Sequence, residues 1–159
     1  MATTDYANRI YDFLALQNTS ATKETQLGLE LAVTGTPGQV TTGIQKLAQR
    51  WLLEFLTEVG SMPGLPTRGT NFMTLVRQGR LRSESAVLAA FTFAAYDARV
   101  NLRKEEDDTW PDDERIAEAT VESIAFLPGY AQIRLKIISR AGTARAIILP
   151  IDTLPKNLT

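Results

Sequence analysis

Apolar side chains recur at intervals of three and four residues through the middle of the chain and alternate with polar ones near its end. The first pattern predicts helices and the second predicts strands. The longest helical pattern is preceded by Thr-Pro-Gly-Gln at residues 36–39, which is typical of a helix N-terminus, and Gly60 is expected to end the helix in a left-handed conformation. The apolar stripe between these two signals consists of Val40, Ile44, Leu47, Ala48, Trp51, Leu52, Phe55 and Leu56.

Two more helices follow a loop at residues 60–69 that is rich in glycine and proline. Residues 71–78 predict a short helix that Gly79 ends. Ser83 is a suitable N-cap for a longer helix, with Glu84 in its first turn. Ten of the eleven residues at 86–96 are apolar, so we expect this helix to be buried on most sides.

The last third of the chain predicts three strands. Residues 131–137 alternate apolar and polar side chains, and Pro-Gly at 128–129 and Ala-Gly at 141–142 indicate turns on either side. Strands at 115–126, 131–137 and 144–149, with Pro150 closing the last, would form an antiparallel meander. The predicted fold class is therefore α+β, with helices packed on one face of a small antiparallel sheet.

The first 35 residues carry weaker signals. Residues 5–17 space Ile10, Phe13 and Leu14 as one face of a short helix, residues 18–22 are a polar run typical of a linker, and leucines at 27, 29 and 31 alternate as in a short strand. The predicted organisation is an N-terminal arm with a short strand at 1–35, a single α+β domain at 36–151 and a C-terminal tail at 152–159.

Composition removes several function classes. The chain has 159 residues, with 17 basic and 18 acidic side chains but no histidine and no cysteine. Disulfides, thiolate or imidazole metal sites and Ser-His or Cys-His relays are therefore excluded. Phosphate-binding glycine motifs are absent, and the most apolar stretch is too short to span a bilayer. We accordingly expect no enzyme activity, no cofactor, no metal, no nucleic-acid partner and no membrane partner.

Charge is distributed unevenly. Seven carboxylates fall between residues 105 and 114, a segment that we interpret as a solvated connection. The rest of the chain has 17 basic and 11 acidic residues, a charge of about +6, which would favour acidic surfaces.

One catalytic alternative remains open. Glu54 and Glu58 lie one helical turn apart beside Trp51 and Phe55. Glycoside hydrolysis needs only two carboxyl groups at a defined separation. The pair is thus compatible with a lysozyme-like muralytic enzyme.

The sequence Leu-Thr-Glu-Val-Gly-Ser at 56–61, followed by Pro66 and Gly69-Thr70, resembles a motif of the baseplate wedge proteins of contractile phage tails. This family includes the sheath initiators related to the type VI secretion baseplate component, long labelled lysozyme-like. The resemblance covers about residues 35–151 and includes the order of helices, turn and sheet. The residues that correspond to the family's structural turn are Thr57, Gly60, Ser61, Pro66, Gly69 and Thr70.

The resemblance implies a structural component of a bacteriophage tail baseplate. Such a protein would dock on the wedge core and tail tube, help to initiate sheath assembly, and reside in the virion after assembly in the host cytoplasm. Its partners would be other wedge proteins and the tube and sheath proteins. From the residues themselves, a strand edge beside a basic face suits strand addition by a partner. We expect 144–149 to be that edge, and the candidate partner-binding residues are Arg134, Lys136, Arg145 and Ile147.

Overall fold

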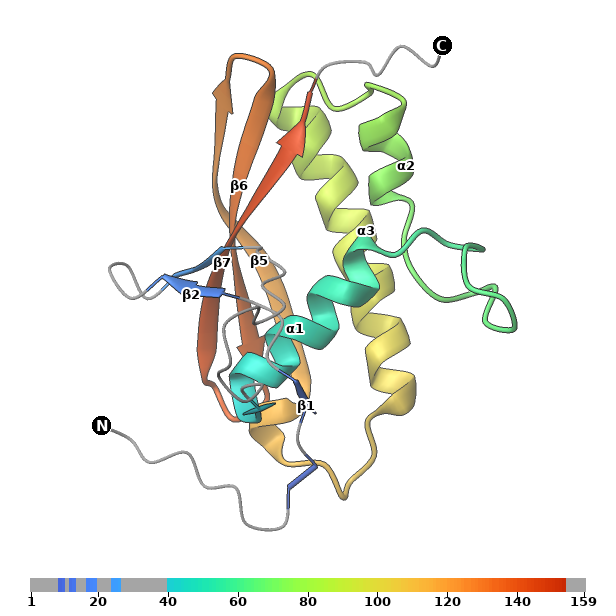
Figure 1. Cartoon of the computed structure of the whole chain (residues 1–159), viewed down its shortest axis with the longest axis vertical. Helices are drawn as coiled ribbons and strands as arrows, with labels where there is room; N and C mark the ends of the chain where they lie inside the picture. The colour runs from blue at the N-terminus through green and yellow to red at the C-terminus, as the bar shows by residue number, and fades with distance from the viewer. Residues whose placement is uncertain (1–8, 11, 14–16, 20–23, 27–39, 154–159) are drawn as a thin grey trace, which may run out of the picture.

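The computed structural model describes residues 9–10, 12–13, 17–19, 24–26 and 40–153. Its fold is α+β, as predicted, with a layer of helices against one layer of sheet (Figure 1). The α-helices of the described ranges are α1 (Gly43–Leu56), α2 (Phe72–Arg77) and α3 (Glu84–Glu105), and a 3-10 turn covers Asp112–Glu114.

The predicted antiparallel meander is confirmed. It consists of β5 (Ile116–Leu127), β6 (Tyr130–Ser139) and β7 (Ala144–Asp152). Gly129 and Gly142 have φ angles of 85° and 77°, which suit the predicted turns. The alternating residues of β6 that the sequence places inward are all fully buried: Ala131, Ile133, Leu135 and Ile137.

The N-terminal region adds strands that the sequence does not predict. In the described part of the chain, β2 (Gln17–Thr19) pairs with β3 (Glu24–Gln26), and β3 lies parallel to β7, giving the sheet order β2-β3-β7-β6-β5. A separate pair joins β1 (Asp12–Phe13) to β4 (Val40–Thr41).

Aromatic side chains form the centre of the core between α1, α2 and α3. Trp51 and Phe55 stack with their ring centroids 4.6 Å apart. Phe55 also lies 4.6 Å from Phe72 and 5.2 Å from Phe91. The rings come from all three helices, so this cluster holds the helices against one another.

Helix α1 begins and ends at residues other than those predicted. It starts at Gly43, because Val40 and Thr41 belong to β4, and the predicted start at 36–39 lies outside the described residues. It ends at Leu56, not at Gly60. Gly60 does have the predicted left-handed conformation, with φ of 81°, but within the turn that follows.

The helix predicted at residues 5–17 is wrong where the structure describes it. Asp12–Phe13 and Gln17 are in strands, and the run at 18–22 predicted as a linker begins inside β2. The strand predicted at 27–31 lies outside the described residues. Local spacing failed here because pairing with distant strands determines the conformation.

Two further expectations are corrected. Helix α3 is buried on one face only, since Leu88, Phe93 and Tyr96 are 46%, 76% and 58% exposed; its alanines made both faces look apolar in the sequence. Pro150 does not close β7, which continues to Asp152. The described pairing of β7 with β3 stops at Ile148, so a residue without an N–H is tolerated two positions later.

Candidate functional site

The segment that carries the family resemblance forms a loop with a closed base between α1 and α2. Glu58 and Thr70 form a parallel bridge. The Thr70 amide donates to the Thr57 carbonyl at 2.8 Å, and the Val59 amide donates to the Thr70 carbonyl at 3.2 Å. Because its two ends are hydrogen-bonded, the segment is a compact loop of the kind that often has a function.

The resemblance residues divide between the base of this loop and its body. At the base, Thr70 Oγ1 donates to the Phe55 carbonyl at 2.6 Å, and Gly69 has a φ of 92°. A Cβ on Gly69 would lie 2.4 Å from the Thr57 carbonyl oxygen, so only glycine fits. In the body, Ser61 Oγ donates to the Glu58 carbonyl at 2.7 Å, and Pro66 is exposed.

A buried carboxylate holds the base of the loop. Glu54 Oε1 accepts from the Gly69 amide and from Asn101 Nδ2, both at 2.8 Å. Its Oε2 accepts from Arg68 Nε at 2.8 Å and Nη2 at 2.5 Å. Arg68 also pairs with Glu105 at the end of α3. Glu54 therefore joins α1, the loop and α3 through one side chain that is almost fully buried.

The environment of Glu54 keeps it ionised. Burial alone would raise the pKa of this carboxyl group, but the hydrogen bonds from Arg68, the Gly69 amide and Asn101 outweigh it and lower the pKa below 4.5. A general acid in glycoside hydrolysis needs the opposite shift. Glu58 has its own partners, Thr74 Oγ1 at 3.0 Å and Arg77. The two carboxylates are thus engaged in separate internal contacts.

The outer surface of the loop is apolar. Val59, Met62 and Leu65 are between 42% and 50% exposed. Because hydrogen bonds fix the base of the loop, the loop would lose little conformational entropy when a partner binds these side chains. Exposed apolar side chains of this kind suit contact with another protein.

The predicted partner-binding residues do not share one face of the sheet. Arg134 and Lys136 on β6 are opposite Ile148 and Ala146. Arg145 and Ile147 on β7 are opposite Ile137 and Leu135, both buried beneath the helices. Directly paired residues project to the same face, so Arg145 and Ile147 lie on the helix-covered face and the two β6 cations lie on the other.

The side chains of these residues differ in accessibility. Arg134 is exposed and donates to Glu122 at 3.0 Å, Lys136 is half-buried, and burial lowers the pKa of Arg145. Ile147 is fully buried.

The expectation that residues 144–149 form a free edge is wrong. Strand β7 is covered by β3 at Ile147 and Ile148. The longer outermost strand of the described sheet is β5, with 12 residues. Between β5 and α3 lies a shallow groove of about 220 Å³, lined by Phe91, Thr92, Ala95, Tyr96, Arg99, Glu118 and Ala119.

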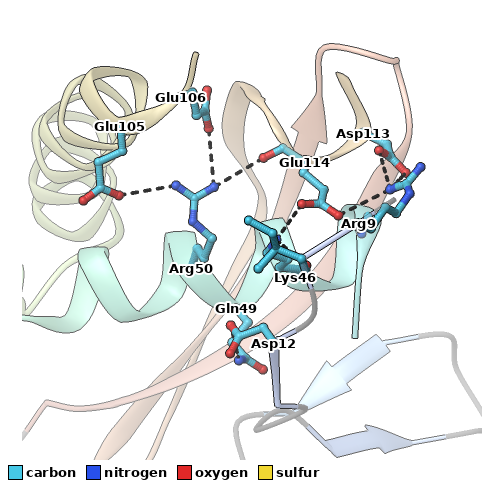
Figure 2. Close-up of polar contacts among 11 residues, drawn as sticks. Arg9, Asp12, Lys46, Gln49, Arg50, Glu105, Glu106, Asp113 and Glu114 are labelled. Carbon is cyan, nitrogen blue, oxygen red and sulfur yellow. Dashed lines mark hydrogen bonds and ion pairs between the residues drawn. The ribbon is translucent and has the colours of Figure 1, made fainter. Parts of the chain in front are cut away.

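A second polar cluster surrounds the N-terminus of α1 (Figure 2). The Glu114 carboxylate accepts from the Gly43 amide at 3.0 Å and from Lys46 Nζ at 2.7 Å, and Arg9 Nη1 lies 3.3 Å away. Glu114 therefore caps α1 in place of Thr42, whose side chain makes no cap hydrogen bond.

The interpretation of residues 105–114 as a solvated connection holds for Asp107, Asp108 and Asp112, which are exposed, but not for two other carboxylates of the segment. Glu114 is buried, and the Glu106 side chain has no exposed surface. Burial raises the pKa of Glu106, although the Ile116 amide and Arg50 counteract it. Arg50 links the two ends of the segment, because it lies 3.4 Å from Glu105, 3.8 Å from Glu106 and 3.4 Å from the Glu114 carbonyl oxygen.

The sequence indicates the loop but not the contacts that hold it. In the sequence, Glu54 is visible only as half of a possible catalytic pair, and no pattern points to Asn101. Asn101 lies 47 residues from Glu54 in the chain, so no local spacing connects them. Arg68 sits in the glycine- and proline-rich segment, and a buried acid opposite it is visible only in the fold.

The described residues contain no group of three or more acidic side chains placed to hold a metal ion. In the same ranges, every helix is too short or too polar to cross a bilayer.

Comparison of the chain with protein-family models, with curated proteins and with solved structures gives no match.

Proposed function

We propose that this chain is a structural component of a contractile tail baseplate, which docks on the wedge core and tail tube and helps to initiate sheath assembly. One observation carries the proposal. Thr57, Gly69 and Thr70, on which the family resemblance rests, close the base of a loop that presents Val59, Met62 and Leu65 to solvent. The loop is the proposed contact with the wedge core.

The arrangement of charged groups supports a binding role over a catalytic one. Glu54, the buried acid nearest the loop, is neutralised by Arg68 and accepts four hydrogen bonds. A carboxylate so occupied stabilises structure and has no free lone pair to offer a substrate. We propose accordingly that the protein has no enzymatic activity.

The edge of β5 that has no neighbouring strand among the described residues is the proposed contact with an extended segment of the tube or sheath. An edge strand presents a row of main-chain donors and acceptors, and a neighbouring groove can take alternate side chains of an added strand. Strand β5 has both features, because the groove against α3 runs beside it. We therefore propose strand addition at β5 in place of β7.

The loop contact is tested by changing its exposed surface in a cell that produces the tail particles. Leu65→Asp and Met62→Asp place a charge on the loop without touching its base, and Ala141→Asp does the same in the exposed turn between β6 and β7. Circular dichroism first establishes that each variant is folded.

We expect the two loop variants to be absent from purified particles and to leave tubes without sheath, whereas Ala141→Asp assembles normally. Normal sheathed particles containing the loop variants would overturn the proposal. A turbidity assay on purified peptidoglycan tests the enzymatic alternative, and clearing that is lost in Glu54→Gln or Glu58→Gln would replace our proposal with it.

A further inference from the structure

Helix α3 has a second apolar face, which the rest of the described chain leaves exposed. The side chains of Leu88, Phe93 and Tyr96 on this face are 46%, 76% and 58% exposed. A row of residues on the same face recurs at alternating intervals of three and four, the spacing of a coiled-coil seam. This row, the α3 seam, consists of Ala86, Ala89, Phe93, Tyr96, Val100 and Arg103, of which Ala86 and Val100 are half-buried and the others exposed, except that Phe93 is the most exposed of its aromatic members.

The core side of α3 is already occupied. The Phe91 ring packs against Trp51 and Phe55 of α1. Phe93 follows two residues later, and a turn of about 100° per residue places it on the opposite side of the helix. The α3 seam therefore points away from the aromatic core and is accessible to another molecule.

The two ends of α3 carry opposite charge. Residues 77–84, which lead into the helix, hold three arginines and one glutamate, whereas residues 103–108 at its other end hold two cations and four carboxylates. Arg80 and Arg82 are exposed at the first end, and Asp107 is exposed at the second. The helix has 22 residues and is about 33 Å long, so these groups cannot meet within one chain.

We propose that two copies of this chain pair through the α3 seam, with the two helices antiparallel. Of the two orientations that align the seams, only the antiparallel one brings the basic end of one helix beside the acidic end of the other. Two-fold symmetry then makes this contact twice. A parallel pair would place Arg103 beside Arg103 of the second copy and like charges at both ends.

The inference goes beyond the proposed function, because it assigns a second copy to a surface centred on Phe93. This residue belongs neither to the loop between α1 and α2 nor to the lining of the groove beside β5. A variant at Phe93 therefore changes the proposed pairing without altering the contacts proposed for the baseplate.

The register follows from the two aromatic residues of the seam. If the two-fold axis passes midway between Phe93 and Tyr96, each ring meets the other kind of ring in the second copy, and aromatic pairs of this kind are favourable. Ala89 then lies level with Val100 of the second copy. A small residue faces a larger one in that layer, as close packing of two helices requires.

Light scattering after size-exclusion chromatography measures the mass of the full chain in solution. At a concentration of about 100 μM we expect a mass of about 35 kDa, twice that of one 17.5 kDa chain. Phe93→Asp, which places a carboxylate at the centre of the seam, should weaken pairing at least about 10-fold. Leu53→Asp is the matched control, because Leu53 is 58% exposed on α1, and it should pair normally.

Circular dichroism first establishes that both aspartate variants are folded. A monomeric mass for the unaltered chain would overturn the proposal. Equal dimer masses for the unaltered chain and Phe93→Asp would also overturn it, because the interface would then lie elsewhere.

The orientation is tested by disulfide formation, since the chain has no cysteine of its own. Ala89→Cys and Val100→Cys should form a disulfide when the two variants are mixed and oxidised, but neither should do so alone. In the antiparallel pair the two copies of residue 89 are roughly 16 Å apart along the helices, which is too far for a disulfide. A disulfide in Ala89→Cys alone would show parallel pairing and refute the proposed orientation.

The charged ends provide a further test. In the proposed register Arg82 is level with Asp107 of the second copy. Arg82→Glu should weaken pairing about 5-fold at low salt, and the double variant Arg82→Glu with Asp107→Arg should restore it. A double variant that pairs no better than Arg82→Glu would contradict the register. These measurements need no tail particles, so their failure is distinguishable from failure of the proposed function.

Discussion

Replacing Glu54 by glutamine should loosen the loop between α1 and α2 at its base. The carboxylate has two donors on each oxygen, and the amide of glutamine can reproduce only one side of this arrangement. Its carbonyl oxygen can accept from Gly69 and Asn101. Its NH₂ group would then face the Arg68 guanidinium, donor against donor.

The size of the effect follows from burial. The Glu54 side chain is 3% exposed and Arg68 is 23% exposed, so the variant leaves a guanidinium with only Glu105 as its acidic partner. Removing one member of a largely buried charged pair costs about 3 kcal/mol. A typical domain has roughly 5–15 kcal/mol of stability in total, so the loss is large enough to measure without unfolding the chain.

Urea unfolding, monitored by circular dichroism, gives the free energy difference. Glu58→Gln is the matched control, because Glu58 pairs with Arg77, whose side chain is 59% exposed. An exposed pair of this kind contributes less than about 1 kcal/mol. We expect Glu54→Gln to lose about three times as much stability as the control, since only Glu54 is buried with its partners.

The pH dependence of stability provides an independent test of the role of the Glu54 carboxylate. Folding lowers the pKa of Glu54 below its ordinary value of 4.5, so its stabilising contribution is present above that pH and disappears as the pH falls through the folded value. The difference between the unaltered chain and Glu54→Gln should therefore shrink below pH 4.5. Equal stabilities at pH 7, or a difference that grows on acidification, would refute this account of the loop.

Three further substitutions test other parts of the structure. Gly69→Ala should lower the free energy of unfolding by about 3 kcal/mol, because the added Cβ would clash with the Thr57 carbonyl. Gly60→Ala has open space around it and should lower it by about 1 kcal/mol, for the left-handed backbone alone. Equal melting temperatures of the two variants would contradict the loop geometry. Phe91→Ala should cost roughly 3–5 kcal/mol in urea unfolding, as expected for a ring buried between two other aromatic side chains, and an unchanged midpoint would place that ring outside the core. Ile147→Pro should unfold the sheet, since it removes a buried side chain and an N–H from a strand with neighbours on both sides. Cooperative thermal unfolding of this variant near the original melting temperature would show that β7 is an edge strand.

The parts of the fold that sequence could predict are those fixed by neighbouring residues. Alternation at 131–137, turn residues at 128–129 and 141–142, and the Ser83 cap each act within a few positions. Ser83 Oγ accepts from the Ala86 amide at 3.2 Å, as the sequence indicates. The meander, α2 and α3 follow from such signals.

The errors arose where distant segments override local signals. The Thr-Pro-Gly-Gln signal at 36–39 points to an early start for α1, but Thr41 pairs with Asp12 and Gly43 is capped by Glu114, 71 residues away. For the same reason the sequence indicates the 60–69 loop through its glycines and prolines, yet gives no sign that Glu54 and Asn101 secure it. Alanine adds a further ambiguity in α3, because it is compatible with buried and exposed positions alike.

Cryo-electron microscopy of purified contractile tail particles, made in cells with and without this chain, tests the baseplate proposal most directly. We predict density for the α+β domain at the baseplate, with Val59, Met62 and Leu65 against the wedge core and an added strand beside β5. We also predict tubes without sheath when the chain is missing. Complete sheathed particles that lack the chain, with no density for it at the baseplate, would contradict the account.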